Sequence, residues 1–174
     1  MTRGRDLARR LVAPAISCAC LAFGPSLAAA DPVALAIANF DYDDTSGEVR
    51  DQSAEHATRL EDFTRLIGNQ LSASGQYEIV TLNCPKARCS AATMDAGSLT
   101  EAARQSGARL LLYGGIHKMS TLIQFGKAQV VDLETDKLVF DRMISFRGDN
   151  DAAWQHAGAF LAKDLLASDL SALR

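Results

Sequence analysis

The chain has 174 residues, with 18 lysines and arginines against 21 aspartates and glutamates. Four of the basic residues and one of the acidic residues lie in the first 30 positions, so residues 31–174 carry a formal net charge of −6. That length fits one domain, and an acidic surface without a basic stripe argues against nucleic acid and anionic membrane surfaces as partners.

The first 30 residues follow the order of a secretory signal peptide. Arginines between positions 3 and 10 give a basic start, residues 11–23 are largely apolar, and small residues at 28–30 precede Asp31. The apolar run is shorter than the roughly 20 residues that span a bilayer. We therefore expect cleavage near Ala30 and a single domain over residues 31–174, periplasmic or secreted, without a membrane span.

Two other processing routes stay open at this N-terminus. Ala15–Cys18 is a poor match to a lipobox, so a lipid anchor at Cys18 or Cys20 is an alternative to simple cleavage. Arg9 and Arg10 fit twin-arginine export only loosely.

The rest of the chain alternates apolar segments with polar turns and predicts the order strand, helix, strand, helix, strand, strand, strand, helix. Strands are expected over residues 33–40, 77–82, 109–119, 122–133 and 138–146, and helices over 56–71, 98–107 and from about Asp151. Residues 41–48 read as a polar loop, and Gly126 suggests a β-bulge. Right-handed crossovers make the first three strands largely parallel, and tight turns make the last two antiparallel. The predicted fold class is α/β, a three-layer single domain with a mixed five-stranded sheet.

Cys84 and Cys89 are the two cysteines that remain after signal cleavage. An even pair close in sequence in an exported chain indicates a structural disulfide. A redox-active pair and a metal site are the alternatives, although redox pairs more often have Cys-x-x-Cys spacing and no histidine lies nearby.

A loop at the carboxyl end of a parallel strand is where ligands of open α/β sheets gather. The loop after the first strand offers Asp41, Asp43 and Glu48 as oxygen ligands for a hard cation. The spacing fails the calcium-loop pattern, because the glycine stands at the seventh position instead of the sixth. We expect a solvated loop without metal or cofactor, and keep these three residues as a weak metal alternative.

Four residues are the tentative binding candidates: Asp44, Arg147, Asp149 and Trp154. Arg147, Asp149 and Trp154 surround the start of the last helix, where they could line a recognition surface. The competing interpretation is structural, because a carboxylate there caps free N–H groups and Trp154 begins the apolar face of its helix.

No catalytic residue is expected. Lys118 and Ser120 lie two apart and could form a Ser-Lys nucleophile pair. The surrounding sequence lacks a nucleophile elbow, so a hydrolase is the least favoured alternative.

Several segments together resemble an uncharacterised family of secreted proteobacterial proteins, the domain of unknown function DUF3280. They are Asp44–Ser46, Gly107–Ala108, Tyr113–Ile123 and Phe146–Trp154. The resemblance extends over nearly all of residues 31–174 and includes the cysteine pair. The chain departs from the pattern at Gly115, where a larger apolar residue is expected, and at Ala153, where serine is expected.

A fainter likeness connects the chain to the N-terminal domain of TolB and to CsgG-type envelope domains. It rests on an apolar first strand ending in Asn39–Phe40 and on the helix stop Ser74–Tyr77 before a short strand. By fold-level analogy, this resemblance implies protein–protein contact in the cell envelope. The predicted function is a non-catalytic periplasmic or secreted module that binds a cell-envelope protein. The alternative is a small-molecule- or metal-binding accessory protein of a periplasmic oxidoreductase, and the oligomeric state stays open.

Overall fold

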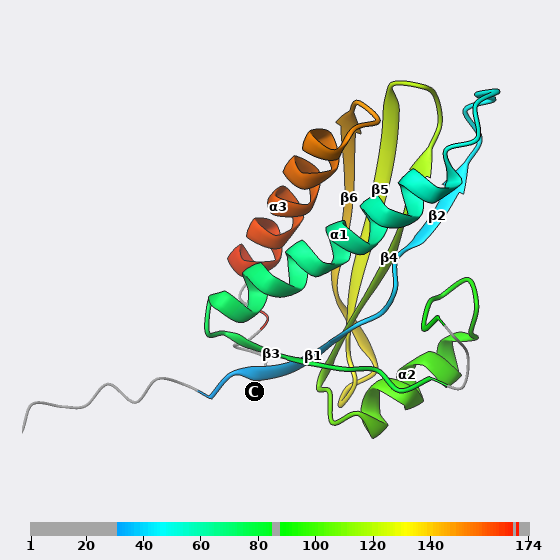
Figure 1. The fold of residues 1–174 in the computed structure, drawn as a ribbon. Coiled ribbons are helices and arrows are strands. Elements are labelled where there is room, and N and C mark those ends of the chain that lie inside the picture. The colour runs from blue at the N-terminus through cyan, green and yellow to red at the C-terminus, as the bar shows by residue number, and fades with distance from the viewer. Residues whose placement is uncertain (1–30, 85–87, 169, 171–174) are drawn as a thin grey trace, which may run out of the picture.

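One mixed sheet of six strands organises the chain in the computed structural model (Figure 1), which describes residues 31–84, 88–168 and 170. The elements are β1 (Val33–Ile37), β2 (Asp41–Asp44), α1 (Ser53–Ala73), β3 (Tyr77–Val80), α2 (Ala96–Gln105), β4 (Leu110–Lys118), β5 (Ile123–Asp132), β6 (Lys137–Arg147) and α3 (Asp151–Ala167). The predicted signal peptide, with Cys18 and Cys20, lies outside the described residues.

The strand order is β3-β1-β4-β5-β6, with β2 paired to β4. Both neighbours of β1 run parallel to it, while β4, β5 and β6 are successively antiparallel. These directions confirm the predicted mixed sheet, because helical crossovers join the parallel strands and tight turns join the antiparallel ones.

The prediction that residues 41–48 form only a loop is wrong for the first four of them. Ile37 pairs with Leu112 and Asp41 with Gly115, so four steps along β1–β2 match three steps along β4. β1 and β2 are therefore one strand interrupted by a bulge with one extra residue. The sixth strand forms because β4 extends beyond β1, and the backbone groups of its last residues need partners there.

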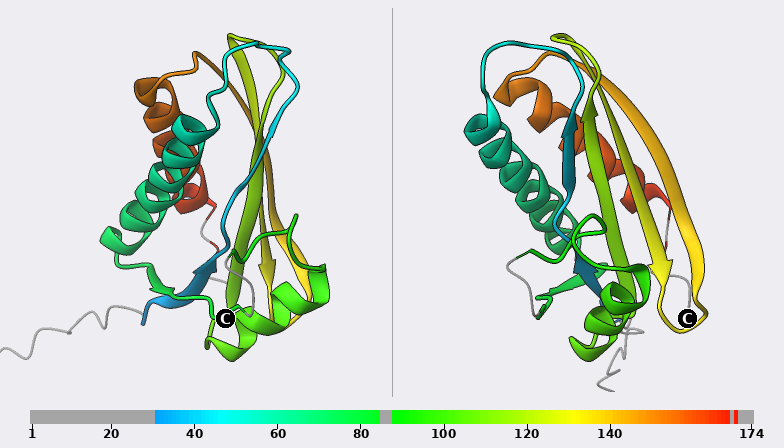
Figure 2. Two further views of the ribbon diagram at one scale, coloured as in Figure 1. Left: turned by 45° about the vertical axis from the view of Figure 1, so that its right-hand side comes forward. Right: turned by 90° about the vertical axis from the view of Figure 1, so that its right-hand side faces the viewer.

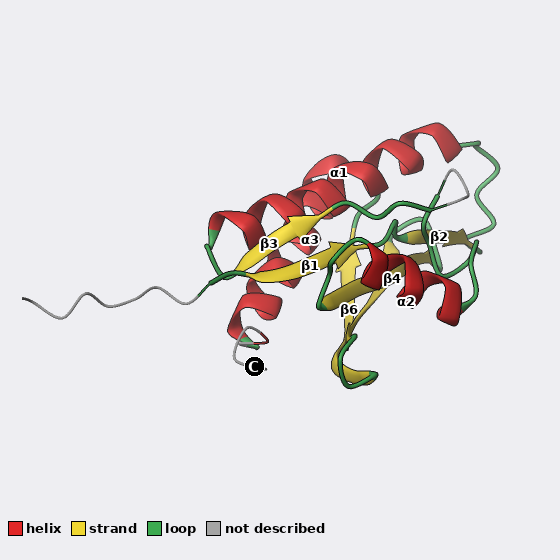
Figure 3. Ribbon diagram, turned by 90° about the horizontal axis from the view of Figure 1, so that it is seen from below, coloured by secondary structure: helices red, strands yellow, loops and turns green. Residues whose placement is uncertain are grey.

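Helices cover both faces of the sheet. α1 and α3 lie on one face, and α2 covers only one end of the other (Figure 2). The view from below shows the strands between α2 and the pair α1–α3 (Figure 3). The larger core holds the predicted stripe of α1, from Leu60 to Leu71, against Trp154 and Leu161 of α3. The three layers are thus present, but none of the described helices covers the remaining part of the sheet face opposite α1 and α3 (Figure 2).

The predicted bulge at Gly126 is also wrong. Gly126 keeps regular pairing with Ile116 and Ile144, and the register shift lies between Val130 and Val131. A Cβ at Gly126 would lie 2.9 Å from both isoleucine side chains, so this glycine makes room for the core.

The predicted disulfide between Cys84 and Cys89 is present. Cys89 exchanges two hydrogen bonds with the bulge: Asn39 N donates to Cys89 O at 2.8 Å, and Cys89 N donates to Asn39 Oδ1 at 2.9 Å. The covalent link therefore restrains the segment that pairs with the interrupted strand. Among the described helices, none combines the length and hydrophobicity of a membrane span.

Candidate functional site

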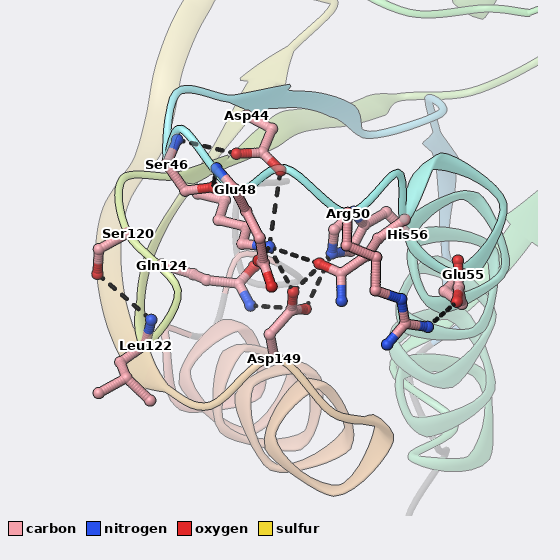
Figure 4. Close-up of polar contacts among 12 residues, drawn as sticks. Asp44, Ser46, Glu48, Arg50, Glu55, His56, Ser120, Leu122, Gln124 and Asp149 are labelled. Atoms are coloured by element: carbon pink, nitrogen blue, oxygen red, sulfur yellow. Dashed lines mark hydrogen bonds and ion pairs between the residues drawn. The ribbon is translucent and has the colours of Figure 1, made fainter.

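A buried lysine marks the end of β4. Lys118 is 0% exposed, and its side chain lies on the face of β4 that α1 and α3 cover. Its ammonium donates to Glu48 Oε2 at 2.6 Å and to Gln52 Oε1 at 2.7 Å, and lies 2.7 Å from Asp149 Oδ2. Asp44 stands 3.7 Å away, and Figure 4 shows it converging with Glu48 and Asp149 on one point. Three carboxylates from two loops and one strand thus meet at this ammonium.

Asp149 extends the same set of contacts to α1. His56 donates through Nε2 to its carboxylate at 2.8 Å, and Arg59 donates at 2.9 Å. Gln124 of β5 adds an amide hydrogen bond at 3.3 Å. We call the six ionisable residues of this arrangement the charge cluster: Asp44, Glu48, His56, Arg59, Lys118 and Asp149.

Electrostatics fix the protonation of the two central groups. Burial by itself raises the pKa of Asp149, but the hydrogen bonds and charges of Lys118 and His56 outweigh it and lower this pKa to about 2. Burial alone would lower the pKa of Lys118, yet hydrogen bonds to Asp149 and Glu48 raise it above the ordinary value. At neutral pH the pair is a buried ammonium beside a buried carboxylate.

Aromatic rings form the apolar side of the charge cluster. The Tyr42 ring lies 4.6 Å from that of His56, and the Trp154 ring lies 5.9 Å from that of Tyr42. Burial, followed by the charges of Asp44 and Asp149, raises the pKa of Tyr42, so the phenol stays neutral. This low-polarity wall strengthens the ion pairs next to it.

A hollow of about 420 Å³ opens beside the charge cluster, between β2 and the start of α1. Tyr42, Gln52, His56 and Arg88 contribute to its walls together with Asp44 and Glu48. The Tyr42 hydroxyl is buried and has no hydrogen-bond partner among the described residues. A second hollow of about 650 Å³ continues along α1 toward Cys89.

The structure places the four tentative binding residues at different depths. Asp44 and Asp149 belong to the charge cluster, and Trp154 is buried beneath it at 2% exposure. Arg147 is exposed at the end of β6, opposite Ile123. Asp149 does not cap α3, because Asn150 takes that role by accepting from Ala153 N at 3.0 Å.

The weak metal set is not brought together. Asp41 and Asp43 alternate with Tyr42 and Asp44 along β2, so their side chains point to the face opposite the charge cluster. Asp41 Oδ2 accepts from Ala92 N at 3.0 Å, and Glu48 is bonded to Lys118. No group of three or more potential metal ligands occurs within the described ranges.

Lys118 and Ser120 do not form the hydrogen-bonded pair that a Ser-Lys nucleophile needs. The hydroxyl of Ser120 accepts from Leu122 N and Ile123 N at 3.3 and 3.1 Å, inside the β4–β5 turn (Figure 4). The ammonium of Lys118 is directed to the carboxylates instead. A protonated lysine in ion pairs does not accept a proton from serine.

Exposed apolar side chains surround the charge cluster at this end of the sheet. Val49 of the β2–α1 loop is fully exposed, Met119 and Leu122 of the β4–β5 turn are 53% and 60% exposed, and Ile123 is 37% exposed. Thr45 N donates to Lys118 O at 2.9 Å, which holds the loop against the strand that leads into the turn. We call these four residues the apolar tip.

The sequence alone does not predict that Lys118, His56 and Arg59 meet Asp149. One signal for it is the alternation along β4, where Leu110, Leu112 and Ile116 share one side of the strand with Lys118. A lysine on the core side of a strand needs buried anionic partners. The identity of those partners depends on contacts between residues up to 93 positions apart, as for His56 and Asp149.

The fold and the site together define a class: an α/β domain with a mixed sheet, a charge cluster around a buried lysine that joins two loops to the end of β4, and an apolar tip at the same end of the sheet. The chain belongs to the DUF3280 family, whose model carries the description "Protein of unknown function (DUF2380)" and matches residues 33–166. This confirms the family predicted from the sequence. No curated protein sequence matches the chain.

Two solved structures share the fold. The hypothetical protein CT253 from Chlamydia trachomatis has a TM-score of 0.52 and 11% identity, covering 82% of this chain and 99% of its own. TolB from Acinetobacter baumannii has a TM-score of 0.50 and 12% identity, covering 80% of this chain and 28% of its own. The predicted fold-level likeness to TolB is confirmed, and at these identities the similarity concerns the fold alone.

Proposed function

We propose that this chain is an exported, non-catalytic binding module that contacts another protein of the cell envelope through its apolar tip. The observation that carries the proposal is the combination of exposed apolar side chains with the charge cluster beneath them. The signal-like N-terminus, the disulfide and the fold shared with TolB support a place in the envelope.

The charge cluster orders the loops next to the apolar tip before a partner binds. Its contacts tie the β2–α1 loop to the end of β4 through Glu48 and to the β6–α3 loop through Asp149. Loops that are already ordered lose less conformational entropy when they bind. Covering one exposed leucine or methionine stabilises a complex by about 1.5–3 kcal/mol, so a few such side chains supply a useful affinity.

The state of the polar groups supports a binding role without catalysis. Lys118 is protonated and Asp149 is ionised, and each is engaged by opposite charge. A general base near neutral pH needs a pKa near 7, and a nucleophile needs such a base beside it. We infer that these residues serve to hold the loops.

Site-specific photo-crosslinking tests the proposal in the periplasm of the native host. A photoreactive residue at position 122 in the apolar tip is compared with one at position 138. Leu138 is a matched control because it is 49% exposed and lies on β6 at the far end of the sheet. We expect a discrete crosslinked envelope protein from position 122 and none from position 138. Equal products from both positions, or none from either, would refute the proposal.

A further inference from the structure

The free edge of β6 has the main-chain geometry of a pairing surface. Among the described strands, β6 pairs only with β5. Gly148 N donates to Leu122 O at 2.9 Å, and in an antiparallel pair every second residue makes such bonds. Gly148 and the even-numbered residues of β6 before it therefore bond to β5, and the odd-numbered residues direct their N–H and C=O groups away from β5. These residues are Asp141, Met143, Ser145 and Arg147.

A hollow of about 570 Å³ separates this edge from α3. Met143 and Phe160 are 67% and 57% exposed, and both line the hollow. Its charged or titratable lining residues are Arg147 and His156, and no carboxylate from the described part of the chain contributes to it. The edge therefore combines unpaired backbone groups, two exposed apolar side chains and a cation.

We propose that a second copy of this chain pairs with the free edge of β6, antiparallel and about a two-fold axis through Ile144. In that register Asp141 of each copy lies opposite Arg147 of the other, and Met143 lies opposite Ser145. The surface is thus complementary to itself, as a two-fold interface requires. Opposite charges placed directly across a strand pair stabilise it.

Among the registers that pair the free backbone groups of both copies, charge selects the one with its axis at Ile144. Axes at Met143 and at Ser145 pair the same groups, but the first places Asp141 opposite Ser145 and the second places Arg147 opposite Met143, so neither forms an ion pair across the strands. An axis at Ile144 pairs residues whose N–H and C=O groups face the free edge in both copies. An axis two residues earlier, at Arg142, places Lys137 opposite Arg147 and draws in the register shift beyond Phe140. An axis two residues later shortens the ladder, because β6 ends at Arg147.

Two further side-chain observations, the position of Phe160 and the charges of Arg147 and Asp141, favour the axis at Ile144. Phe160 of α3 and Ile144 line one hollow, so a two-fold axis through Ile144 brings the two Phe160 rings toward each other over the joined sheet. Arg147 makes no ion pair within the part of the chain that the structure describes, while Asp141 lies 3.6 Å from the half-exposed Lys127. The free arginine accordingly gains a carboxylate in the dimer.

The interface lies on the free edge of β6, and its end at Arg147 is one strand away from Leu122 of the apolar tip. A crosslink from position 122 to a second copy is distinguished from a crosslink to an envelope protein by the mass of the product. Charged side chains on an edge strand also protect monomeric proteins from unwanted pairing. In that case β6 would remain unpaired and the chain monomeric, and the charge-reversal experiment below separates the two roles.

Sedimentation velocity of the processed chain, residues 31–174, tests the pairing by charge reversal. We expect a wild-type dimer, a dissociation constant raised by about tenfold or more in Asp141→Arg and in Arg147→Asp, and recovery in the double variant. Glu61→Arg makes the same change of charge on the exposed side of α1 and should leave the dimer intact. Circular dichroism melting verifies that each variant is folded.

Three outcomes would overturn the pairing. They are a wild-type monomer at the highest attainable concentration, a dimer indifferent to both single reversals, and a double variant that does not recover. Crosslinking from position 122 does not depend on these results, so a failure here leaves the proposed function standing.

Discussion

Lys118 occupies a core position of β4 because its partners replace the water that it loses. Moving an ammonium into a protein interior costs several kcal/mol unless opposite charge and hydrogen bonds compensate. Glu48, Asp149 and Gln52 supply three oxygens at 2.6–2.7 Å. Removing the ammonium alone would leave the nearly buried carboxylate of Asp149 beside the partly exposed one of Glu48, which is less favourable than either the full set or an apolar replacement.

Replacing Lys118 with methionine should therefore be costly. The side chain keeps its length, but Glu48 loses its counter-charge and Asp149 keeps only Arg59 and His56. We expect about 3 kcal/mol of destabilisation, at the lower end of the range for a broken buried ion pair. Lys127→Met is the control, because Lys127 is half exposed and its ion pair with Asp141 is worth about 1 kcal/mol or less. Urea unfolding measures both values. Equal losses for the two variants would contradict a stabilising role for the charge cluster.

The lowered pKa of Asp149 predicts how the stability of the fold changes at acid pH. Its pKa falls from 3.8 to about 2 on folding, so the unfolded chain takes up a proton more readily than the folded chain. The contribution, about 2 kcal/mol, is present above pH 4 and is lost as the pH falls toward 2. Asp149→Asn should flatten the stability profile between pH 4 and pH 2, measured by urea midpoints at each pH. An unchanged slope would show that other groups govern the acid transition.

At the scale of elements, the sheet depends on close approaches that glycine permits. A Cβ at Gly114 would lie 2.1 Å from Lys127 O, a backbone atom of β5, and 2.8 Å from the Phe40 ring. Gly68 in α1 is different, since its nearest atom is Ile37 Cδ1 at an ordinary 3.5 Å. The two positions therefore predict opposite effects of one added methyl group.

Gly114→Ala should lower the free energy of unfolding by more than about 2 kcal/mol, because the backbone of β5 must move. Gly68→Ala should raise it by about 0.5–1 kcal/mol, because alanine favours a helix interior. Thermal melting of both variants checks the signs. A neutral Gly114→Ala would mean that β4 and β5 are less closely paired than the structure has them.

The sequence predicts the elements that have a strong local pattern. The α1 stripe from Leu60 to Leu71 repeats at helical spacing, and Val33–Phe40 is a continuous apolar run. β2 has no such pattern: its residues Asp41–Asp44 are mostly charged, and they form a strand only because β4 extends beside them. Tertiary pairing therefore overrides local propensity at β2.

The candidate site is less predictable than the fold. Asp149 and Trp154 stand out in the sequence, but their setting depends on His56 and Lys118, which come from α1 and β4. A loop aspartate reads equally well as a helix cap, and Asn150 is the residue that caps α3. Whether such an aspartate caps a helix or joins an ion pair depends on contacts between distant segments. The residue periodicity within one segment does not reveal those contacts.

At the scale of the whole molecule, the two ends of the sheet differ. One end carries α2 and the disulfide-linked segment against β1, while the other carries the apolar tip above the charge cluster (Figure 1). The ion pairs of Lys118 hold the β2–α1 and β6–α3 loops against the end of β4. The tip presents apolar side chains from the first of these loops and from the β4–β5 turn. A rigid presentation of this kind favours one defined partner surface.

The affinity of the chain for the envelope protein that crosslinks to position 122 tests this account most directly. Isothermal titration calorimetry would compare the wild-type chain with Leu122→Asp in the apolar tip and Leu138→Asp at the far end of β6. We predict that Leu122→Asp weakens binding by at least about tenfold, because a buried leucine contributes more than about 1.4 kcal/mol. Leu138→Asp should stay near the wild-type value, and equal affinities for all three chains would contradict the account.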